Sequence, residues 1–200
     1  MKIIGLTGPT GAGKSFSYSV FERYNIYCID TDSVYHDLLI PPSRCVDELV
    51  KNFGDSILNG DGTLNRKDLA KIVFSDASHQ KVELLEKITH KYIIDKTHEI
   101  IDKCYQNGNT AVVIDAPVLF ESELAFECDF SIAVICDKET RLKRIMERDS
   151  LTREQALMRI NAQQPDEYFT SRANYTVVND SPDNTSEEQI IEILKKEKLI

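Results

Sequence analysis

The sequence predicts a layered α/β fold built around a parallel sheet, and three observations lead to that prediction. Short segments rich in aliphatic residues recur along the 200-residue chain, and their hydrophobicity is nearly continuous instead of alternating, as in strands buried on both faces. Helical patterns lie between these segments, which implies right-handed βαβ units. A glycine-rich corner, GPTGAGKS at residues 8–15, joins the first apolar segment to the first helical pattern.

Five segments are predicted as strands, the last of them from a weaker apolar pattern than the other four. In chain order they are KIIGLT (2–7), IYCID (26–30), AVVID (111–115), FSIAVIC (130–136) and YTVVN (175–179).

Helices are predicted from the glycine corner to about Tyr24, over residues 138–148, from near Thr152 onwards, and over about 186–198. The tetrapeptide Thr-Arg-Glu-Gln at residues 152–155 resembles a capping box with one polar residue displaced, and therefore marks the start of a helix.

The stretch from Ser33 to about Asn107 contains helical patterns but no convincing strand. Its segments LAKIVF (69–74) and VELLEKITHKYIIDKTHEIIDKC (82–104) are typical of helices, and NGDG (59–62) is a turn signal. We therefore predict an all-helical insertion between the second and third strands, of the kind that often forms a second wall over a ligand cleft.

The composition is that of an ordinary globular protein, with 42% hydrophobic and 28% charged residues. A net charge of −9 disfavours nucleic-acid binding, which needs a basic footprint. No stretch approaches the roughly 18 consecutive apolar residues of a membrane span, and the N-terminal stretch shows no cleavage-site pattern, so we predict neither a span nor a signal peptide. The five widely spaced cysteines are expected to be free thiols in a reducing compartment, which predicts a cytoplasmic protein.

The glycine corner matches the phosphate-binding pattern GxxxxGK[ST] through Gly8, Gly13, Lys14 and Ser15. Glycines let the backbone approach a ligand closely, and successive N–H groups followed by a helix N-terminus form an anion-binding nest. Lys14 would reach the β- and γ-phosphates, and the Ser15 hydroxyl would bind Mg²⁺. The alternative is a turn that merely joins a strand to a helix, but the strand–loop–helix setting favours the nucleotide.

Carboxylates follow two of the predicted strands at the end where ligands bind in open α/β sheets. Asp32 could accept a proton from an attacking hydroxyl or help to hold Mg²⁺, and it could equally cap the next helix. Asp115 is placed like the acidic residue of a second nucleotide-binding motif that binds the metal directly or through water. For Glu121, a place in the same cleft and a solvated surface position both remain open.

The helical pattern RLKRIMER places Arg141, Arg144 and Arg148 on one face, because these residues are three and four positions apart. Such a stripe can be a solvated face. Its position after the fourth strand favours at least one arginine as a clamp for phosphate charge, since the planar guanidinium can bind two phosphate oxygens.

Several motifs, in order, resemble the dephospho-coenzyme A kinase family. They are GLTGPTGAGKS, IDTD after the second strand, FGDSILNGDGTLNRKDLAKIVF in the insertion, DAPVLFE, RLKRIMERD, RINAQQ and YTVVND. The resemblance covers essentially the whole chain, and the insertion motif is more diagnostic than the phosphate loop, which many kinases share.

The resemblance implies ATP-dependent phosphorylation of the ribose 3′-hydroxyl of dephospho-CoA, the last step of CoA synthesis, with Mg²⁺. It also implies a three-layer P-loop kinase fold with a five-stranded parallel sheet, an all-helical CoA-binding insertion and a helical lid. The expected boundaries are 1–32 and 108–200 for the nucleotide-binding core, about 141–165 for the lid, and 33–107 for the insertion.

By position in these motifs, Asp32 matches the proposed general base of the family, and Asn179 lies near the nucleotide base. The expected catalytic residues are Asp32, Lys14, Arg144 and Arg148. Nucleotide binding is assigned to Gly8, Gly11, Ala12, Gly13, Lys14, Ser15, Phe16 and Asn179. Substrate binding is assigned to Asp32, His90, Asp115, Arg141 and Gln163, and Mg²⁺ binding to Ser15 and Asp115.

Two alternatives to this function remain open at the level of sequence. One is a kinase for a nucleoside, a nucleoside monophosphate or another small hydroxyl acceptor, and the other is a nucleotide-gated binding module that transfers nothing. The chain also departs from the usual family pattern at Gly8-Pro9 in place of Gly-Gly, His90-Lys91 in place of His-Pro, and Asn174-Tyr175 in place of Ala-Asp.

Overall fold

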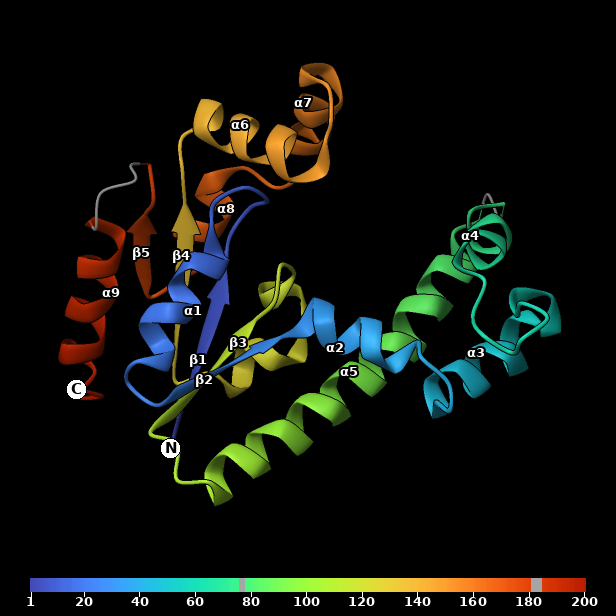
Figure 1. Cartoon of the computed structure of the whole chain (residues 1–200), viewed down its shortest axis with the longest axis horizontal. Coiled ribbons are helices and arrows are strands. Elements are labelled where there is room, and N and C mark those ends of the chain that lie inside the picture. Colours follow the sequence, from blue (N-terminus) through green and yellow to red (C-terminus); the bar gives the residue numbers. More distant parts are fainter. Residues whose placement is uncertain (76–77, 181–184) are drawn as a thin grey trace. The chain divides into compact units, whose positions relative to one another are not determined.

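The computed structural model of the chain describes residues 1–75, 78–180 and 185–200. The chain forms two compact units, one made of residues 1–29 and 103–200 and the other of residues 30–102. Figure 1 shows their elements. Within the described ranges, no helix combines the length and the hydrophobicity that crossing a membrane requires.

The first unit is built on a five-stranded parallel sheet in the order β2-β3-β1-β4-β5, which confirms the predicted α/β sheet. Its strands are β1 (Lys2–Thr7), β2 (Ile26–Asp30), β3 (Ala111–Asp115), β4 (Phe130–Ile135) and β5 (Tyr175–Val178). The last two strands each end one residue earlier than the apolar pattern predicts. Cys136 and Asn179 therefore lie just beyond the carboxyl edge of the sheet, although the Asn179 N–H still donates to the Ile135 carbonyl, at 2.9 Å.

Helices α1 and α9 cover one face of this sheet. The helices and short 3₁₀ turns of the unit outside α5 are α1 (Lys14–Glu22), η2 (Leu119–Glu121), η3 (Glu123–Glu127), α6 (Lys138–Asp149), α7 (Arg153–Asn161), α8 (Asp166–Thr170) and α9 (Thr185–Lys196). Phe21 of α1 and Leu194 of α9 are fully buried against Leu6 of β1 and Ile132 of β4. On the opposite face Leu119 packs so closely on β1 that a Cβ at Gly5 would lie 2.6 Å from its methyl group.

Beyond the carboxyl end of β4, helices α6 and α7 pack on one another through Leu142, Ile145, Ala156 and Ile160 (Figure 1). The expected displaced capping box at the start of α7 is wrong. Thr152 accepts from the N3 backbone N–H, and the side chain of that N3 residue, a glutamine, accepts from the Thr152 N–H, so the box is regular. This pairing fixes the point at which the chain reverses between the two helices.

The second unit is helical in the described residues, apart from an isolated bridge between Leu58 and Leu64. Its elements are α2 (Thr31–Leu38), α3 (Arg44–Phe53), η1 (Asp55–Ile57), α4 (Arg66–Phe74) and most of α5 (Gln80–Gln106). A separate apolar cluster that includes Leu49, Ile57, Leu69 and Ile88 holds them together. This unit therefore has its own core.

The core of the first unit provides a stability test. We expect Phe21→Ala to lower the free energy of unfolding by about 3–5 kcal/mol, because it leaves a cavity beneath the sheet. Phe126→Ala is the matched control, since this phenylalanine is 91% exposed and its removal opens no cavity. Urea unfolding of both variants is the measurement, and equal losses of stability would contradict the described packing.

Candidate active site

The glycine-rich loop joins β1 to α1, and two of its glycines are required by close contacts. Gly8 has φ +143°, and a Cβ there would lie 2.1 Å from the Val134 carbonyl oxygen. Gly13 has φ +90°, and a Cβ there would lie 2.3 Å from the Asn179 side-chain nitrogen. Both positions therefore exclude any larger residue, and they let the loop pack directly against β4 and Asn179.

Arginines on α6 turn the carbonyls of the loop in one direction. Arg141 Nε donates to the Thr10 carbonyl at 3.0 Å, and Arg144 Nη1 donates to the Ala12 carbonyl at 3.2 Å. Because a trans peptide group is planar, the N–H of the glycine that follows each carbonyl points away from α6. The two N–H groups are thereby aimed to the side on which an anion could bind, as in a backbone nest.

Lys14 opens α1 and is held at the loop. Its Nζ donates to the Gly8 carbonyl at 3.2 Å and lies 3.8 Å from Oδ1 of Asp115, with the lysine side chain 15% exposed. The ammonium group therefore lies between the loop and the end of β3. A phosphate at the loop would offer it a stronger, charged acceptor than the carbonyl it now contacts.

Asp115 ends β3 and is 6% exposed, so its carboxylate is held by the protein interior. The Tyr18 hydroxyl of α1 donates to its Oδ2 at 2.7 Å, while Oδ1 faces Lys14. Ser15, the other predicted metal ligand, is exposed on the first turn of α1 beside Phe16, which is also exposed. A hydroxyl and a carboxylate are hard oxygen donors, so this pair suits Mg²⁺.

Arg141 is the most deeply buried of the three α6 arginines. Besides its bond to the loop, it donates from Nη1 to Asp166 Oδ1 at 2.9 Å, and only 6% of its side chain is exposed. The loop residue it contacts, Thr10, also donates its N–H to Oε1 of Gln163 at 2.8 Å. Arg141 and Gln163, which are both predicted from the sequence to bind the substrate, thus contact the same residue of the loop.

Arg148, two turns after Arg141 on α6, is exposed and forms a bidentate ion pair with Asp149, with N–O distances of 2.8 and 2.9 Å. Arg159 of α7 binds the same carboxylate. The hydrogen bonds from Arg148 hold the pKa of Asp149 below its ordinary value, so this carboxylate keeps its charge. Arg148 also reaches Thr10 Oγ1 at 3.4 Å, which brings it to the loop.

Asn179 connects the loop to the end of β5. Its side-chain Nδ2 donates to the Ala12 carbonyl at 2.8 Å, and its own carbonyl accepts from Arg144 Nη2 at 3.0 Å. Arg144 Nη1 also lies 3.3 Å from Sγ of Cys136, and burial raises the pKa of this thiol to about 11. The structure thus gathers Arg144, Asn179 and the loop into one hydrogen-bonded group around a neutral thiol.

Two of the predicted site residues, Asp32 and His90, belong to the second unit. The N-cap of α2 is Asp30, whose carboxylate accepts from the N–H groups of Asp32 and Ser33 at 2.9 and 3.2 Å. Asp32 is therefore not the cap, and its carboxylate lies exposed in the first turn of α2. His90 is exposed on α5. The functional roles of Asp32 and His90 stay predictions.

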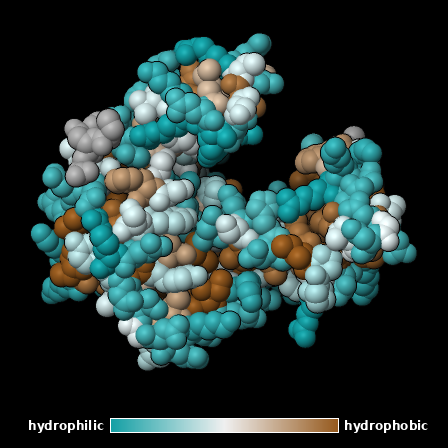
Figure 2. Space-filling view, in the orientation of Figure 1, coloured by the Kyte–Doolittle hydropathy of each residue, from teal (hydrophilic) through white to brown (hydrophobic). Residues whose placement is uncertain are grey.

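The second unit also contains a pocket of ≈650 Å³ between α2, residues 40–45 and α5. Apolar residues, including Leu38, Ile40 and Ile100, line it together with charged residues such as Asp37 and Lys96. Hydrophobic surface gathers beside the C-terminal end of α2 in Figure 2. The volume is within the range of small-molecule pockets, so this unit could accommodate part of a ligand.

Sequence reasoning missed Tyr18, Cys136 and Asp166 as neighbours of the site. Tyr18 carried a usable signal, since it lies four residues after Lys14 and therefore on the same face of α1. Asp166 and Cys136 meet their arginines only through tertiary packing. Glu121, left open above, is exposed and hydrogen-bonds the Tyr168 hydroxyl, which raises the pKa of that tyrosine.

A glycine substitution tests the loop as an anion site. We expect Gly13→Ala to abolish measurable ADP binding, because the added Cβ would collide with Asn179 and the positive φ would be strained. Gly60→Ala is the control, since nothing lies within 4 Å of a Cβ at that position. Isothermal titration calorimetry measures both, and binding by the Gly13 variant as tight as by the control would contradict the described loop.

Comparison with known proteins finds relatives that match nearly the whole chain. The dephospho-CoA kinase family model matches residues 2–185. A dephospho-CoA kinase from Listeria monocytogenes is 36% identical over 195 residues, covering 98% of this chain and 96% of that protein. Another from Halalkalibacterium halodurans is 33% identical over 198 residues, covering 99% of this chain and 98% of that protein.

Solved structures show the same fold. A protein from Thermus thermophilus superimposes with a TM-score of 0.80 at 26% identity, covering 98% of this chain and 97% of the other. A dephospho-CoA kinase from Campylobacter jejuni gives a TM-score of 0.65 at 22% identity, and a shikimate kinase from Bacteroides thetaiotaomicron gives 0.54 at 14%, each over nearly the whole length of both chains. The phosphate loop, the parallel sheet and these matches lead to one conclusion: the chain belongs to the dephospho-CoA kinase family of P-loop kinases.

Proposed function

We propose that this protein transfers the γ-phosphoryl group of ATP to the ribose 3′-hydroxyl of dephospho-CoA, giving CoA and ADP. The observation that carries the proposal is the phosphate loop with Lys14 beside the nearly buried Asp115, in a chain that matches the family over residues 2–185. A loop of this kind binds a nucleotide phosphate chain through backbone N–H groups and a lysine.

The nucleotide is proposed to bind along the loop from Gly8 to Phe16, with its base near Asn179. The N–H groups turned away from α6 support this proposal, and so does the close packing of Gly13 on Asn179, which holds the loop in its conformation. On binding, Lys14 would exchange the Gly8 carbonyl for phosphate oxygens.

Magnesium is proposed to be held by the Ser15 hydroxyl and by Asp115, directly or through water. The donor set supports it, because both groups are the oxygen ligands that Mg²⁺ prefers. When bound, Mg²⁺ neutralises charge on the phosphate oxygens.

Asp32 is proposed as the base that orients the acceptor hydroxyl and accepts its proton. Asp30 caps α2, so Asp32 is not needed for that task. In the in-line transfer the bond between the γ-phosphorus and its bridging oxygen breaks, and a bond forms from the 3′-oxygen to that phosphorus. The proton of the hydroxyl moves to Asp32, and ADP leaves with the bridging oxygen.

The α6 arginines are proposed to divide their work. Arg144, with four hydrogen bonds to the loop, Asn179 and Cys136, keeps the loop in shape. Arg141 and Arg148 pair with carboxylates that a phosphate could replace, and we propose that they stabilise the charge of the transferring group.

The division of the chain follows from these roles. We propose residues 1–32 and 108–200 as the nucleotide-binding core, about 141–165 as a lid that excludes water, and 33–107 as the substrate-binding insertion, with His90 and Gln163 contributing to substrate binding. The pocket in the second unit supports a binding role for the insertion. The five free thiols favour action in the cytosol.

Substitution of the proposed base gives the first test. Asp32→Asn should lower kcat by a factor on the order of 10²–10⁴ while KM for ATP changes little, because the amide cannot accept the proton. Asp47→Asn, at an exposed position in the first turn of α3 and outside the pocket, is the matched control and should retain near-normal kcat. Steady-state kinetics measures both, and normal turnover by the Asp32 variant would remove this residue from the base role.

The acceptor is tested directly by ADP release. With ATP and Mg²⁺, dephospho-CoA should stimulate ADP release strongly, whereas AMP, adenosine or no acceptor should leave it low. Stimulation by one of the smaller acceptors would agree with phosphoryl transfer at the phosphate loop but would overturn the assignment of dephospho-CoA as the acceptor. Slow hydrolysis of ATP at a rate that no acceptor changes would overturn the assignment of the protein as a kinase.

A further inference from the structure

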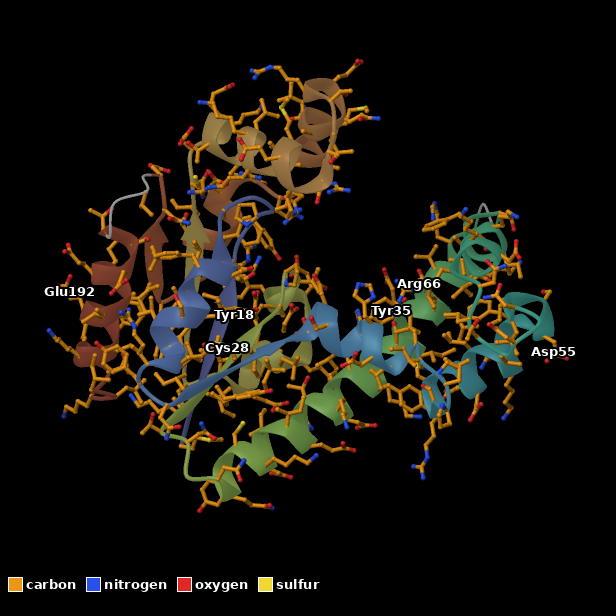
Figure 3. All side chains as sticks on the ribbon, viewed as in Figure 1. Tyr18, Cys28, Tyr35, Asp55, Arg66 and Glu192 are labelled. Carbon is orange, nitrogen blue, oxygen red and sulfur yellow. The ribbon has the colours of Figure 1, made fainter. Side chains whose placement is uncertain are left out.

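Tyr18 makes a close contact with a residue of the proposed metal site. Its hydroxyl donates to Oδ2 of Asp115 at 2.7 Å, and Oδ1 of the same carboxylate lies 3.8 Å from Nζ of Lys14. Tyr18 and Lys14 are four residues apart on α1, so their side chains leave the same face of the helix. Figure 3 shows Tyr18 on the side of α1 that faces β3 and β2, where Cys28 also lies.

The surroundings hold this tyrosine in place. The Tyr18 ring packs against the apolar cluster beneath the sheet, which limits the directions that its hydroxyl can take. Asp115 is 6% exposed, so water solvates its carboxylate poorly. A hydrogen bond from a fixed donor to this carboxylate is therefore strong. The contact therefore fixes which oxygen of Asp115 faces the protein and which faces Lys14.

We propose that Tyr18 is a positioning residue for Asp115. By holding Oδ2 of Asp115, the Tyr18 hydroxyl keeps Oδ1 turned toward Lys14 and the loop, where Oδ1 would contact the Mg²⁺ of a bound nucleotide. This inference rests on the proposed nucleotide chemistry, because a carboxylate near the loop needs a fixed direction only if it has a metal to bind.

The need for Tyr18 is greatest when the nucleotide binds. Lys14 then turns its ammonium group to the phosphates, so Asp115 exchanges a nearby cation of the protein for the metal of the ligand. The bond from Tyr18 does not change in that exchange, and it spares the carboxylate from reorienting. Loss of the hydroxyl should therefore weaken binding of the metal–nucleotide complex more than binding of the nucleotide alone.

The variant Tyr18→Phe removes one oxygen and leaves the packed ring. Its matched control is Tyr175→Phe, because the Tyr175 hydroxyl also donates to a carboxylate, Glu197, at 2.6 Å, and its ring packs against the same apolar cluster. The described partners of the Tyr175 side chain, Glu197, Phe130 and Lys196, all lie outside the residues that we assign to the site. Both variants thus lose a tyrosine–carboxylate hydrogen bond, but only one loses it beside the loop.

ADP binding, measured by calorimetry with Mg²⁺ and again with EDTA, is the readout. We expect Tyr18→Phe to weaken binding in Mg²⁺ by about tenfold and to leave binding in EDTA nearly unchanged, while the control changes neither. Equal weakening in both conditions, or none in Mg²⁺, would overturn the proposal, since either result means that the hydroxyl does not act through the metal.

A double-mutant cycle separates the positioning role from a structural one. If Tyr18 acts through Asp115, Tyr18→Phe should have no further effect on Mg²⁺-dependent ADP binding in the Asp115→Asn background. Additive effects would contradict the proposal. These binding measurements need no dephospho-CoA, so a wrong acceptor leaves them interpretable, and failure of the wild type to bind ADP at all would instead overturn the proposed function.

Discussion

The orientation of the peptide groups at residues 10–13 is the constraint on which the site depends. A glycine-rich loop has many accessible conformations, and it binds an anion well only when successive N–H groups point the same way. Here Arg141 and Arg144 donate hydrogen bonds to carbonyl groups of the loop, and Asn179, at the end of β5, is a third donor to the loop. The protein's own side chains therefore hold the loop in this conformation, so that a ligand has less conformational entropy to remove.

This arrangement explains how a chain with a net charge of −9 can hold a polyanion. The positive groups that contact the loop come from one helix, α6, and from the first residue of α1. Several are paired locally with carboxylates, as Arg141 is with Asp166 and Arg148 with Asp149. These pairs keep the two arginines oriented beside Thr10 of the loop, which both of them contact.

Much of the fold was predictable from the chain itself. Continuous apolar runs located all five strands. For β1, β3 and β4 the reason is that strands buried on both faces have no polar side to interrupt the run, whereas β2 and β5 at the sheet edges are partly exposed. The helical spacing of Arg141, Arg144 and Arg148 predicted a shared face, and all three do reach the loop. The capping box of α7 was misjudged, since the position of Gln155 in the box depends on where the helix begins.

The sequence by itself determined the sheet, the phosphate loop and the family, because these are encoded in local patterns of a few residues. Only the tertiary structure decided which side chains hydrogen-bond to the site residues: Tyr18 to Asp115, Arg141 to Asp166, and Arg144 to Cys136. These pairs join residues separated by 97, 25 and 8 positions. Hydrogen bonds between such distant side chains exist only once the sheet has brought its strand ends to one edge, and no local pattern records which donor will face which acceptor there.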